Sequence, residues 1–499
     1  MTAAALLLAA SVYTRSLERV ASLDPIDAQA VYDSKVVQLL YETPLDIDYA
    51  ARPYRLVPAA CELPEVSADG RKYTFRMRTR AVTAKDAVAS LERLRDPANA
   101  SPGGWTMKAV ERFDVLDDAT FSVTLKERMH VFPWMMAMSY AAIRRPDGSG
   151  TGPYALASWR KNHEMRFVRN PAWWTEHAAE TEPGAPFDEL RFLVIDDAST
   201  QWLMFLKGEL DFLGEISRDN WDAVVNGDGT IDPRLAAEGV RLTSIPNISS
   251  FYIGINMKDP VLGSNRKLRQ ALNCAFDSPA WKVFYNNRVE ASTGPVPPGV
   301  DGRLEAPFAY AFDVEKAKRL LAEAGYEGGI DPATGRRLVL ALDIGRASQD
   351  SRESGELLAS FFARVGIRLE LRFHTWGAFM KLVDEGRSQM YMMGWVGDYP
   401  DAENFLQLFH SRNVSPGANH SNYVNPDFDA AYDAAMAASD PEARNVLWRK
   451  AQEIVCEDCP WIFTHYGKSY SLVRPRVGNY IPSDFPYGQE KHLRVEETK

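Results

Sequence analysis

The sequence predicts an α/β protein with more than one domain. Its 499 residues are too many for one ordinary hydrophobic core, so two or three domains are expected. Residues 338–396 read in turn as strand, helix, strand, helix and strand, which is the pattern of an α/β layer. Residues 191–213 read as strand, helix and strand, an order that implies parallel pairing of the two strands.

The chain is expected to open with a strand and a helix. Residues 11–22 alternate weakly between polar and apolar side chains, and Pro25 follows that run. Residues 32–41 place apolar side chains at i, i+3 and i+4, which is the spacing of an amphipathic helix. Pro44 marks the end of this helix.

A smaller α+β subdomain is expected over about residues 46–150. Residues 73–78 alternate strictly and predict a half-buried strand. Thr83 and Asp86 have the spacing of a capping box, with Asp86 where Glu or Gln is usual, and they open a helix. Residues 120–125 predict a second alternating strand, so this region reads as strand, helix and strand.

Periodicity and turn residues divide the rest of the chain. Two predicted helices end at Gly325 and Gly366. The expected strands are 151–159 (after a Gly-Pro turn), 164–169, 191–195, 208–213, 251–256, 338–343, 367–373, 390–396, 461–472 and 493–496, and the expected helices are 198–207, 268–276, 313–324, 354–365, 376–385, 428–438 and 442–455.

The stretch from Met390 to Asp401 is the most informative part of the chain. It begins as an apolar run, typical of a strand buried on both faces, and stops at a Gly-Asp-Tyr-Pro turn. Asp398 lies in that turn, beside Trp395 and Tyr399. Ligands of open α/β sheets bind at the carboxyl ends of strands, and a carboxylate beside aromatic rings suits an ammonium group. The alternative is that Asp398 only shapes the turn.

Composition excludes some classes of partner. The net charge of −10 argues against nucleic acid or an anionic membrane as the main partner. No internal run reaches the ~18 apolar residues of a membrane span.

The first ten residues resemble the apolar core of a secretory signal, but neither Lys nor Arg precedes this core and no Cys follows it. They fit a signal remnant, a trimmed start or a first strand.

Four cysteines are present, and Cys456 and Cys459 form a C-x-x-C pair. One such pair, without a second pair or a histidine partner, is weak support for zinc. It closes the predicted helix 442–455 instead of opening one, so redox catalysis is not expected. We expect a local disulfide if the protein is exported and two inert thiols if it is not.

The sequence predicts no enzyme, no cofactor and no metal site. The eight histidines are scattered, and no H-E-x-x-H, G-x-S-x-G or P-loop motif occurs. His374 and His465 lie near strand ends, and lone histidines of this kind are more often polar residues with a structural partner.

An ordered series of motifs over about residues 12–498 resembles the extracytoplasmic solute-binding proteins of family 5, the receptors of peptide and related ABC importers. The motifs are Leu23-Asp24-Pro25, Leu40-Tyr41-Glu42, Asp69-Gly70 with Tyr73-Thr74-Phe75, Thr83 to Asp86, Thr151-Gly152-Pro153-Tyr154 with Trp159, Arg169-Asn170-Pro171 with Trp174, Asn256, Arg269-Gln270-Ala271-Leu272, Ala317-Lys318 with Leu321 and Ala324-Gly325-Tyr326, Gly366-Ile367, Gly394-Trp395 with Asp398 to Asp401, and Pro460-Trp461-Ile462.

The resemblance implies a two-lobe periplasmic-binding-protein-like fold (type II, cluster C). Lobe I comprises residues 1–245 with the inserted subdomain 46–150 and the returning segment 470–499, and lobe II comprises 246–469. The lobes of such proteins close on a ligand by hinge motion. It further implies a monomer in the periplasm or elsewhere outside the cytoplasm, with a membrane permease as partner. The chain departs from the family in its short segments after Met77 and before residue 151, and it has no lipobox.

The resemblance also implies roles for site residues. In the peptide-binding members, the aspartate at the position of Asp398 accepts the α-ammonium of the peptide, and the tryptophan at the position of Trp395 lines the side-chain pocket. Arg346 is the candidate for the peptide carboxylate, with Arg352 next, although a solvated loop arginine is the alternative. Tyr399 and Trp376 complete the expected ligand contacts.

The sequence does not name the solute. Members of the family also bind oligosaccharides, glutathione, opines, and metal chelates or haem, so His374 is of interest for the last group. A sensor or a chaperone-like binder that is not coupled to transport is the competing class of function.

Overall fold

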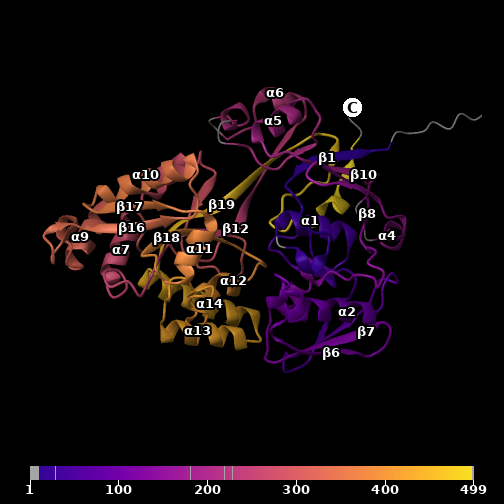
Figure 1. Cartoon of the computed structure of the whole chain (residues 1–499), viewed down its shortest axis with the longest axis horizontal. Helices are drawn as coiled ribbons and strands as arrows, with labels where there is room; N and C mark the ends of the chain where they lie inside the picture. The colour runs from indigo at the N-terminus through magenta and orange to yellow at the C-terminus, as the bar shows by residue number, and fades with distance from the viewer. Residues whose placement is uncertain are drawn as a thin grey trace, which may run out of the picture. The chain divides into compact units, whose positions relative to one another are not determined.

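The computed structural model describes residues 10–28, 30–179, 181, 183–217, 220–226 and 229–496, and the chain divides into two compact units. Unit 1 contains the residues up to Ile245 and from Tyr470 onwards, and unit 2 contains Pro246–Ser469. The chain passes from one unit to the other within two long strands, β12 (Arg241–Ile255) and β19 (Trp461–Val473). Figure 1 shows the elements of each unit.

The central sheet of unit 1 is mixed. β1 (Val12–Leu17) pairs in parallel with β10 (Glu189–Val194) on one side and with β11 (Phe212–Leu213) on the other. β9 (Glu164–Arg169) and β8 (Tyr154–Arg160) continue the sheet in antiparallel fashion beyond β10. The predicted direct pairing of the strands at 191–195 and 208–213 is therefore wrong. The two strands are parallel to each other, but β1 lies between them and pairs with both.

The smaller sheet of unit 1 is antiparallel, in the order β4 (Glu65–Val66), β5 (Lys72–Arg76), β7 (Thr120–Leu125) and β6 (Val110–Val115). The buried rings of Phe75 and Phe121 stack 5.1 Å apart on one of its faces. α2 (Ala84–Arg95) contacts β6 and β7. Its capping box is confirmed, because Thr83 N donates to Asp86 Oδ2 (2.8 Å) and Asp86 N donates to Thr83 Oγ1 (3.4 Å).

Short helices and hairpins complete unit 1. They are η1 (Pro25–Asp27), α1 (Val31–Leu40), β2 (Leu45–Ile47), β3 (Leu56–Pro58), η2 (Pro97–Asn99), η3 (Gly104–Met107), α3 (Phe132–Met135), η4 (Ser139–Ala141), α4 (Pro171–Glu176), α5 (Ala198–Leu206), η5 (Trp221–Ala223), α6 (Pro233–Ala237), β20 (Val477–Gly478), η9 (Gln489–His492) and β21 (Arg494–Val495).

Unit 2 contains the predicted α/β layer. β16 (Val339–Ile344), α10 (Gln349–Ala363), β17 (Arg368–Phe373), α11 (Trp376–Asp384) and β18 (Met390–Val396) follow one another as expected. β16 pairs in parallel with both β17 and β18, and β18 pairs antiparallel with β12. The carboxyl ends of β16, β17 and β18 therefore meet at one edge of the sheet.

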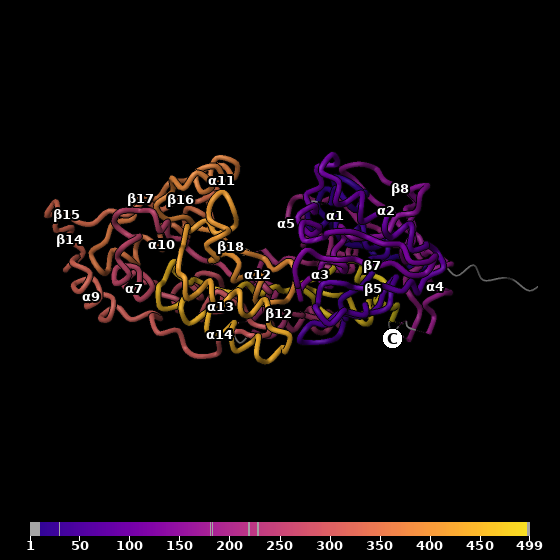
Figure 2. The backbone as a smooth tube through the Cα atoms, turned by 90° about the horizontal axis from the view of Figure 1, so that it is seen from below, coloured from indigo at the N-terminus to yellow at the C-terminus, as the bar shows by residue number. Residues whose placement is uncertain are grey.

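Further helices and short strands complete unit 2. The helices are α7 (Arg266–Ala275), α8 (Ser278–Phe284), α9 (Val314–Glu323), η6 (Glu327–Gly329), α12 (Glu403–Leu406), η7 (Gln407–Phe409), η8 (Ser411–Asn413), α13 (Pro426–Ala437) and α14 (Pro441–Asp458), and the strands are β13 (Val289–Ala291), β14 (Ile330–Asp331) and β15 (Arg336–Arg337). α13 and α14 lie side by side in both views of the chain (Figures 1 and 2).

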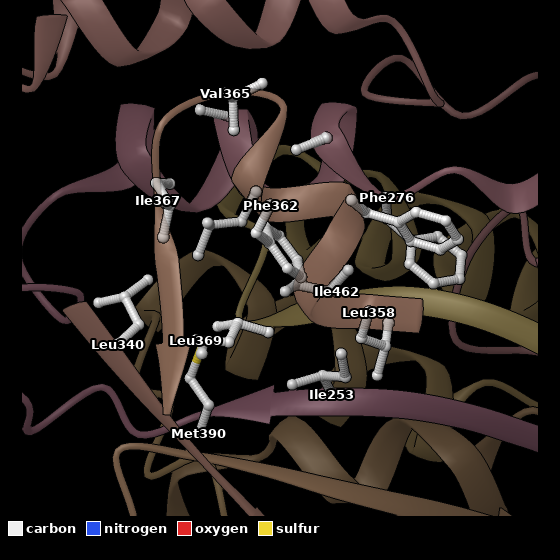
Figure 3. Close-up of a cluster of buried hydrophobic side chains, with 14 of the residues drawn as sticks. Ile253, Phe276, Leu340, Leu358, Phe362, Val365, Ile367, Leu369, Met390 and Ile462 are labelled. Carbon is white, nitrogen blue, oxygen red and sulfur yellow. The ribbon is translucent and has the colours of Figure 1, made fainter. Parts of the chain in front are cut away.

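The core of unit 2 forms where α10 lies against the sheet. Leu358 and Phe362 project from α10 towards Leu340, Ile253 and neighbouring apolar side chains of the strands (Figure 3). All four side chains are almost fully buried. Because α10 covers the strands whose ends carry the candidate site, this core holds those ends in place.

The cysteines do not form the bridge expected for an exported protein. All four are free and buried in this structure. Cys459 takes the left-handed conformation that ends α14, and its thiol donates to the carbonyl oxygen of Cys456 at 3.1 Å. Burial raises the pKa of Cys456 to about 12, which favours the unreactive thiol form.

Every helix in the part of the chain that the structure describes is too short or too polar to cross a lipid bilayer.

Candidate functional site

Asp398 lies two residues beyond the end of β18 and is held by the side chain of Asn404, in α12. Asn404 Oδ1 accepts hydrogen bonds from Trp395 Nε1 (2.8 Å) and from Asp398 N (3.0 Å). These two donors fix the orientation of the amide, so its nitrogen must face the carboxylate. Asn404 Nδ2 accordingly donates to Asp398 Oδ2 at 3.2 Å.

The carboxylate of Asp398 has no ion-pair partner among the described residues. Burial raises the pKa of Asp398 above its usual range, and the hydrogen bond from Asn404 opposes that rise. A nearby cation would stabilise the ionised form. Asp398, with the half-buried indole of Trp395 three residues away, is therefore suited to bind a cationic group.

Tyr399 follows Asp398 in the same turn. Its side chain is only 2% exposed, and its hydroxyl donates to Glu403 Oε2 at 2.6 Å. The hydroxyl of Tyr432, from α13, donates to the other oxygen of Glu403 at 2.6 Å. The buried Glu403 thus joins the turn that contains Asp398 to α13.

Arg346 follows β16 and is exposed. Ile344 pairs with Met392 in the parallel register of β16 and β18, so Arg346 is about level with Gly394. Asp398 lies four residues further along, or at most about 13 Å at the rise of a strand. Both charged groups therefore follow the carboxyl ends of neighbouring parallel strands.

Trp376 is the first residue of α11 and is 58% exposed. A Cβ atom added to Gly345 would lie 3.0 Å from Cε3 of Trp376, so the indole lies against the loop that carries Arg346. The guanidinium of Arg352, the second candidate, lies over the ring of Phe373, 4.9 Å from its centre.

The two histidines of interest have structural partners. His374 Nε2 lies 2.7 Å from Asp343 Oδ1, and Ser388 Oγ donates to the other oxygen of Asp343 at 2.6 Å. His465 accepts a hydrogen bond from Trp281 Nε1 at 3.0 Å, and burial lowers the pKa of His465 to about 3. Within the described ranges, no group of three or more His, Cys, Asp or Glu residues could hold a metal ion.

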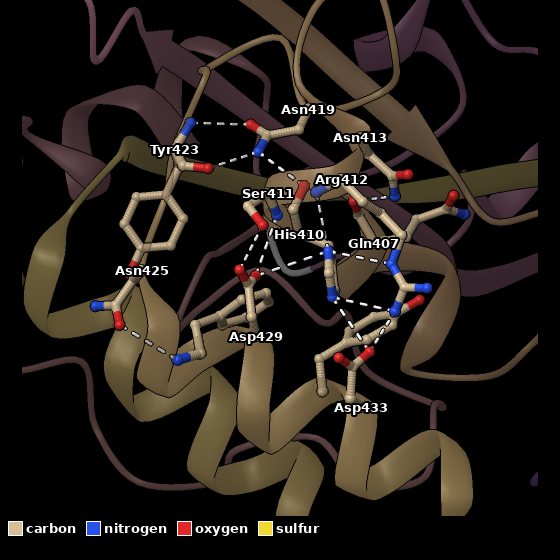
Figure 4. A network of polar contacts seen from close by, with 12 residues as sticks. Gln407, His410, Ser411, Arg412, Asn413, Asn419, Tyr423, Asn425, Asp429 and Asp433 are labelled. Atoms are coloured by element: carbon tan, nitrogen blue, oxygen red, sulfur yellow. Dashed lines mark hydrogen bonds and ion pairs between the residues drawn. The ribbon is translucent and has the colours of Figure 1, made fainter.

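A second polar network anchors the segment that follows α12 (Figure 4). Ser411 donates to Asp429 through its backbone N–H (3.1 Å) and its hydroxyl (2.5 Å). His410 Nδ1 accepts from the backbone N–H of Arg412 at 3.1 Å, and His410 Nε2 lies 3.3 Å from Asp433 Oδ1 and 3.2 Å from a guanidinium nitrogen of Arg412. These bonds attach the segment to α13 and thereby support α12.

Sequence reasoning missed Asn404 and Glu403. Both lie in a segment that reads as an ordinary amphipathic helix, and neither belongs to a motif of charged or metal-binding residues. Polar side chains in the first turn of a short helix directly after the Asp398 turn were the available signal.

The family described as bacterial extracellular solute-binding proteins, family 5 (middle), matches residues 55–416. Heme-binding protein A of Haemophilus influenzae is 27% identical over 482 residues, with 86% of this chain and 82% of that protein covered. The dipeptide-binding protein of Escherichia coli is 25% identical over 499 residues, with 90% of this chain and 88% of that protein covered.

The solved structure of HbpA2 from Haemophilus parasuis has the same fold, with a TM-score of 0.83 and 23% sequence identity over 97% of this chain and 100% of that one. The predicted two-lobe, mixed α/β fold is thereby confirmed. The family match covers well over half of the chain. The protein belongs to the family 5 bacterial extracellular solute-binding proteins.

Proposed function

We propose that the protein is a receptor of an ABC importer that binds a short peptide, or a peptide-like solute, by its free ammonium group. The observation that carries the proposal is Asp398, a carboxylate oriented by Asn404 and without an ion-pair partner among the described residues. An ammonium group bound there gains a charge-assisted hydrogen bond. The indole of Trp395 adds an aromatic face for the cation or for the first side chain.

Arg346 is our candidate for the carboxylate of the peptide. Its backbone lies at most about 13 Å from that of Asp398 along the strand direction. An extended peptide advances about 3.3–3.6 Å per residue, and the arginine side chain covers part of the separation. A ligand of two or three residues therefore fits between the two charges. We assign the exposed ring of Trp376 to a ligand side chain and Tyr399 to the support of Asp398.

The name of the Escherichia coli relative supports a dipeptide, whereas the name of the Haemophilus influenzae relative points to haem. The geometry favours the peptide, because Asp398 offers a site for a cation while His374 already pairs with Asp343. Haem is retained as the second candidate on the strength of that relative.

Native mass spectrometry of the purified protein, followed by calorimetry with dialanine, trialanine and haemin, tests the proposal. We expect one dipeptide or tripeptide per chain and a marked loss of affinity when the peptide is N-acetylated. Tight binding of haemin without binding of either peptide would reject the peptide and favour the second candidate.

We further propose that the protein acts outside the cytoplasm as a monomer and delivers its ligand to a membrane permease. The family name supports the location. Light scattering after size exclusion, with and without dialanine, tests the monomer, for which a mass near 55.9 kDa is expected.

A further inference from the structure

Unit 1 contains a cavity of about 490 Å³, and every residue that lines it belongs to unit 1. Its walls come from the end of α1, the β2–β3 hairpin, α4 and the segment around η9. This volume falls within the range of small-molecule sites in proteins. Nothing in the proposed function uses it.

One wall of the cavity is a chain of three side chains. The rings of Trp173 and His177 stack with their centres 4.3 Å apart at an angle of 14°. His177 Nδ1 lies 3.0 Å from the carbonyl oxygen of Trp173, which can only accept, so Nδ1 carries a hydrogen. His177 Nε2 lies 3.3 Å from Glu42 Oε1, and this carboxylate raises the pKa of His177 against the lowering effect of burial.

Two polar atoms of this wall lack a hydrogen-bond partner among the described residues. They are Glu42 Oε2 and Trp173 Nε1. Each residue is only 8% exposed, and both line the cavity. Buried polar atoms of folded proteins are nearly always hydrogen-bonded, so a buried acceptor and a buried donor that lack partners, on two residues of the same wall, indicate a missing partner.

The other charged side chains of the lining have partners of their own. Arg78 pairs with Glu62 at 3.1 Å, and Arg494 donates to the backbone carbonyl oxygens of Lys491 and Leu493 at 2.8 Å. Lys491 pairs with Asp46, and Arg55 pairs with Asp48 at 2.7 Å. The ring of Tyr49 stacks on His492 with centres 4.3 Å apart, and His492 is neutral because burial lowers its pKa to about 3. The cavity is thus lined by aromatic rings, by charged side chains that already have partners, and by one buried acceptor and one buried donor that have none among the described residues.

We propose that this cavity is a second binding site, for a small, neutral, planar heteroaromatic molecule that carries a hydrogen-bond donor next to an acceptor. Primary amides and amines of nitrogen heterocycles have this chemistry. The donor of such a molecule faces Glu42, its acceptor faces the indole N–H of Trp173, and its ring packs against the aromatic lining. A cavity filled only with water is the competing interpretation.

Nicotinamide and nicotinate form a matched pair of probes. They share a ring and differ in one substituent: nicotinamide has an N–H donor, while nicotinate has none and is anionic beside Glu42. Calorimetry and ligand-observed NMR on the full chain should detect one nicotinamide per chain and at least about tenfold weaker binding of nicotinate.

Two variants locate the site. Trp173→Phe removes the indole N–H and keeps an aromatic ring over His177, while Ala50→Trp fills the cavity from an exposed backbone position. Ala333→Trp is the matched control, because Ala333 N bonds to Asp331 in unit 2 as Ala50 N bonds to Asp48 in unit 1. We expect about a tenfold or greater loss of nicotinamide affinity in the first two variants and none in the control.

Absence of nicotinamide binding up to about 10 mM, equal binding of nicotinate, or unchanged affinity in Ala50→Trp would each overturn the proposal. The thermal midpoint of every variant is measured alongside, so that a misfolded Trp173→Phe protein does not decide the outcome, which then rests on Ala50→Trp. Dialanine binding is a separate readout, because that ligand is assigned to unit 2.

Discussion

Replacement of Asp398 by asparagine is the most direct perturbation of the proposed peptide site. Asn404 cannot turn its amide to suit the new side chain, because Trp395 Nε1 and the backbone N–H of residue 398 both bond to its oxygen. Its N–H group therefore continues to face residue 398, and the new carboxamide must present its oxygen to it. The NH₂ group of the carboxamide then faces the ligand. The variant loses the charge and also turns a donor towards the ammonium.

The magnitude follows from this geometry. Two unit charges about 4 Å apart at an effective dielectric constant near 20 attract by about 4 kcal/mol. Loss of one partner of a buried, hydrogen-bonded charge pair costs about 2–5 kcal/mol. The expected decrease in affinity is about 30-fold to several thousand-fold. Because the donor is turned towards the ligand, we expect a value in the upper half of that range.

Calorimetry with dialanine and N-acetyl-dialanine on the wild type and on Asp398→Asn gives a double-mutant cycle. Each change destroys the same ion pair, so the two effects should be strongly non-additive. Glu323→Gln, which removes an exposed carboxylate of α9, controls for the change in net charge. If Asp398→Asn binds dialanine as tightly as the wild type does, the ammonium assignment is refuted.

Three further perturbations are informative. Asn404→Leu removes the hydrogen bond that opposes the rise in the pKa of Asp398, so the pH below which dialanine affinity falls should move upwards. Titration calorimetry from about pH 4 to 7 measures this shift. An unchanged pH profile would show that Asn404 does not set the pKa of Asp398. Burial alone would raise the pKa of Glu164, but hydrogen bonds from two arginines outweigh it and lower the pKa to about 2. The ionised carboxylate of Glu164 therefore contributes fully to the free energy of unfolding above its usual pKa of 4.5, and this contribution is lost as the pH falls towards about 2. In urea denaturation, the free energies of unfolding of the wild type and of Glu164→Gln should differ at pH 7 and converge in acid. A difference that stays constant with pH contradicts this prediction. Phe362→Ala should lower the unfolding free energy of unit 2 by about 3–5 kcal/mol, against about 0.5 kcal/mol or less for the exposed Leu203→Ala in unit 1, and similar losses would argue against the core assignment.

The α/β layer of unit 2 could be predicted because each of its elements carries a strong local signal. The strands read as short apolar or alternating runs, and Gly366 ends a helix at a position where the backbone is left-handed (φ 86°). β6 gave no such signal, since its charged side chains are exposed and a bulge separates Val110 from Arg112. β12 was read only over its second part, because Pro246 lies inside the strand.

The candidate site was predictable only where its residues are consecutive. Trp395, Asp398 and Tyr399 surround one turn, so the sequence brings them together. Asn404 organises the site through hydrogen bonds that cross from one element to the next, and periodicity reports nothing of such bonds. Likewise, Tyr399 reads as an exposed aromatic beside a turn, yet its partner Glu403 and the hydroxyl of Tyr432 make it part of the interior.

The fixed amide of Asn404 also determines whether the side chain of Asp398 loses its conformational entropy on folding or on ligand binding. A flexible carboxylate must give up rotational freedom when it captures a ligand, and that loss weakens binding. Asp398 is already immobilised by Asn404 when the chain folds, so the entropy is lost during folding. The arriving ammonium group therefore meets an acceptor that is already ordered, and most of the attraction between the two charges remains available for affinity.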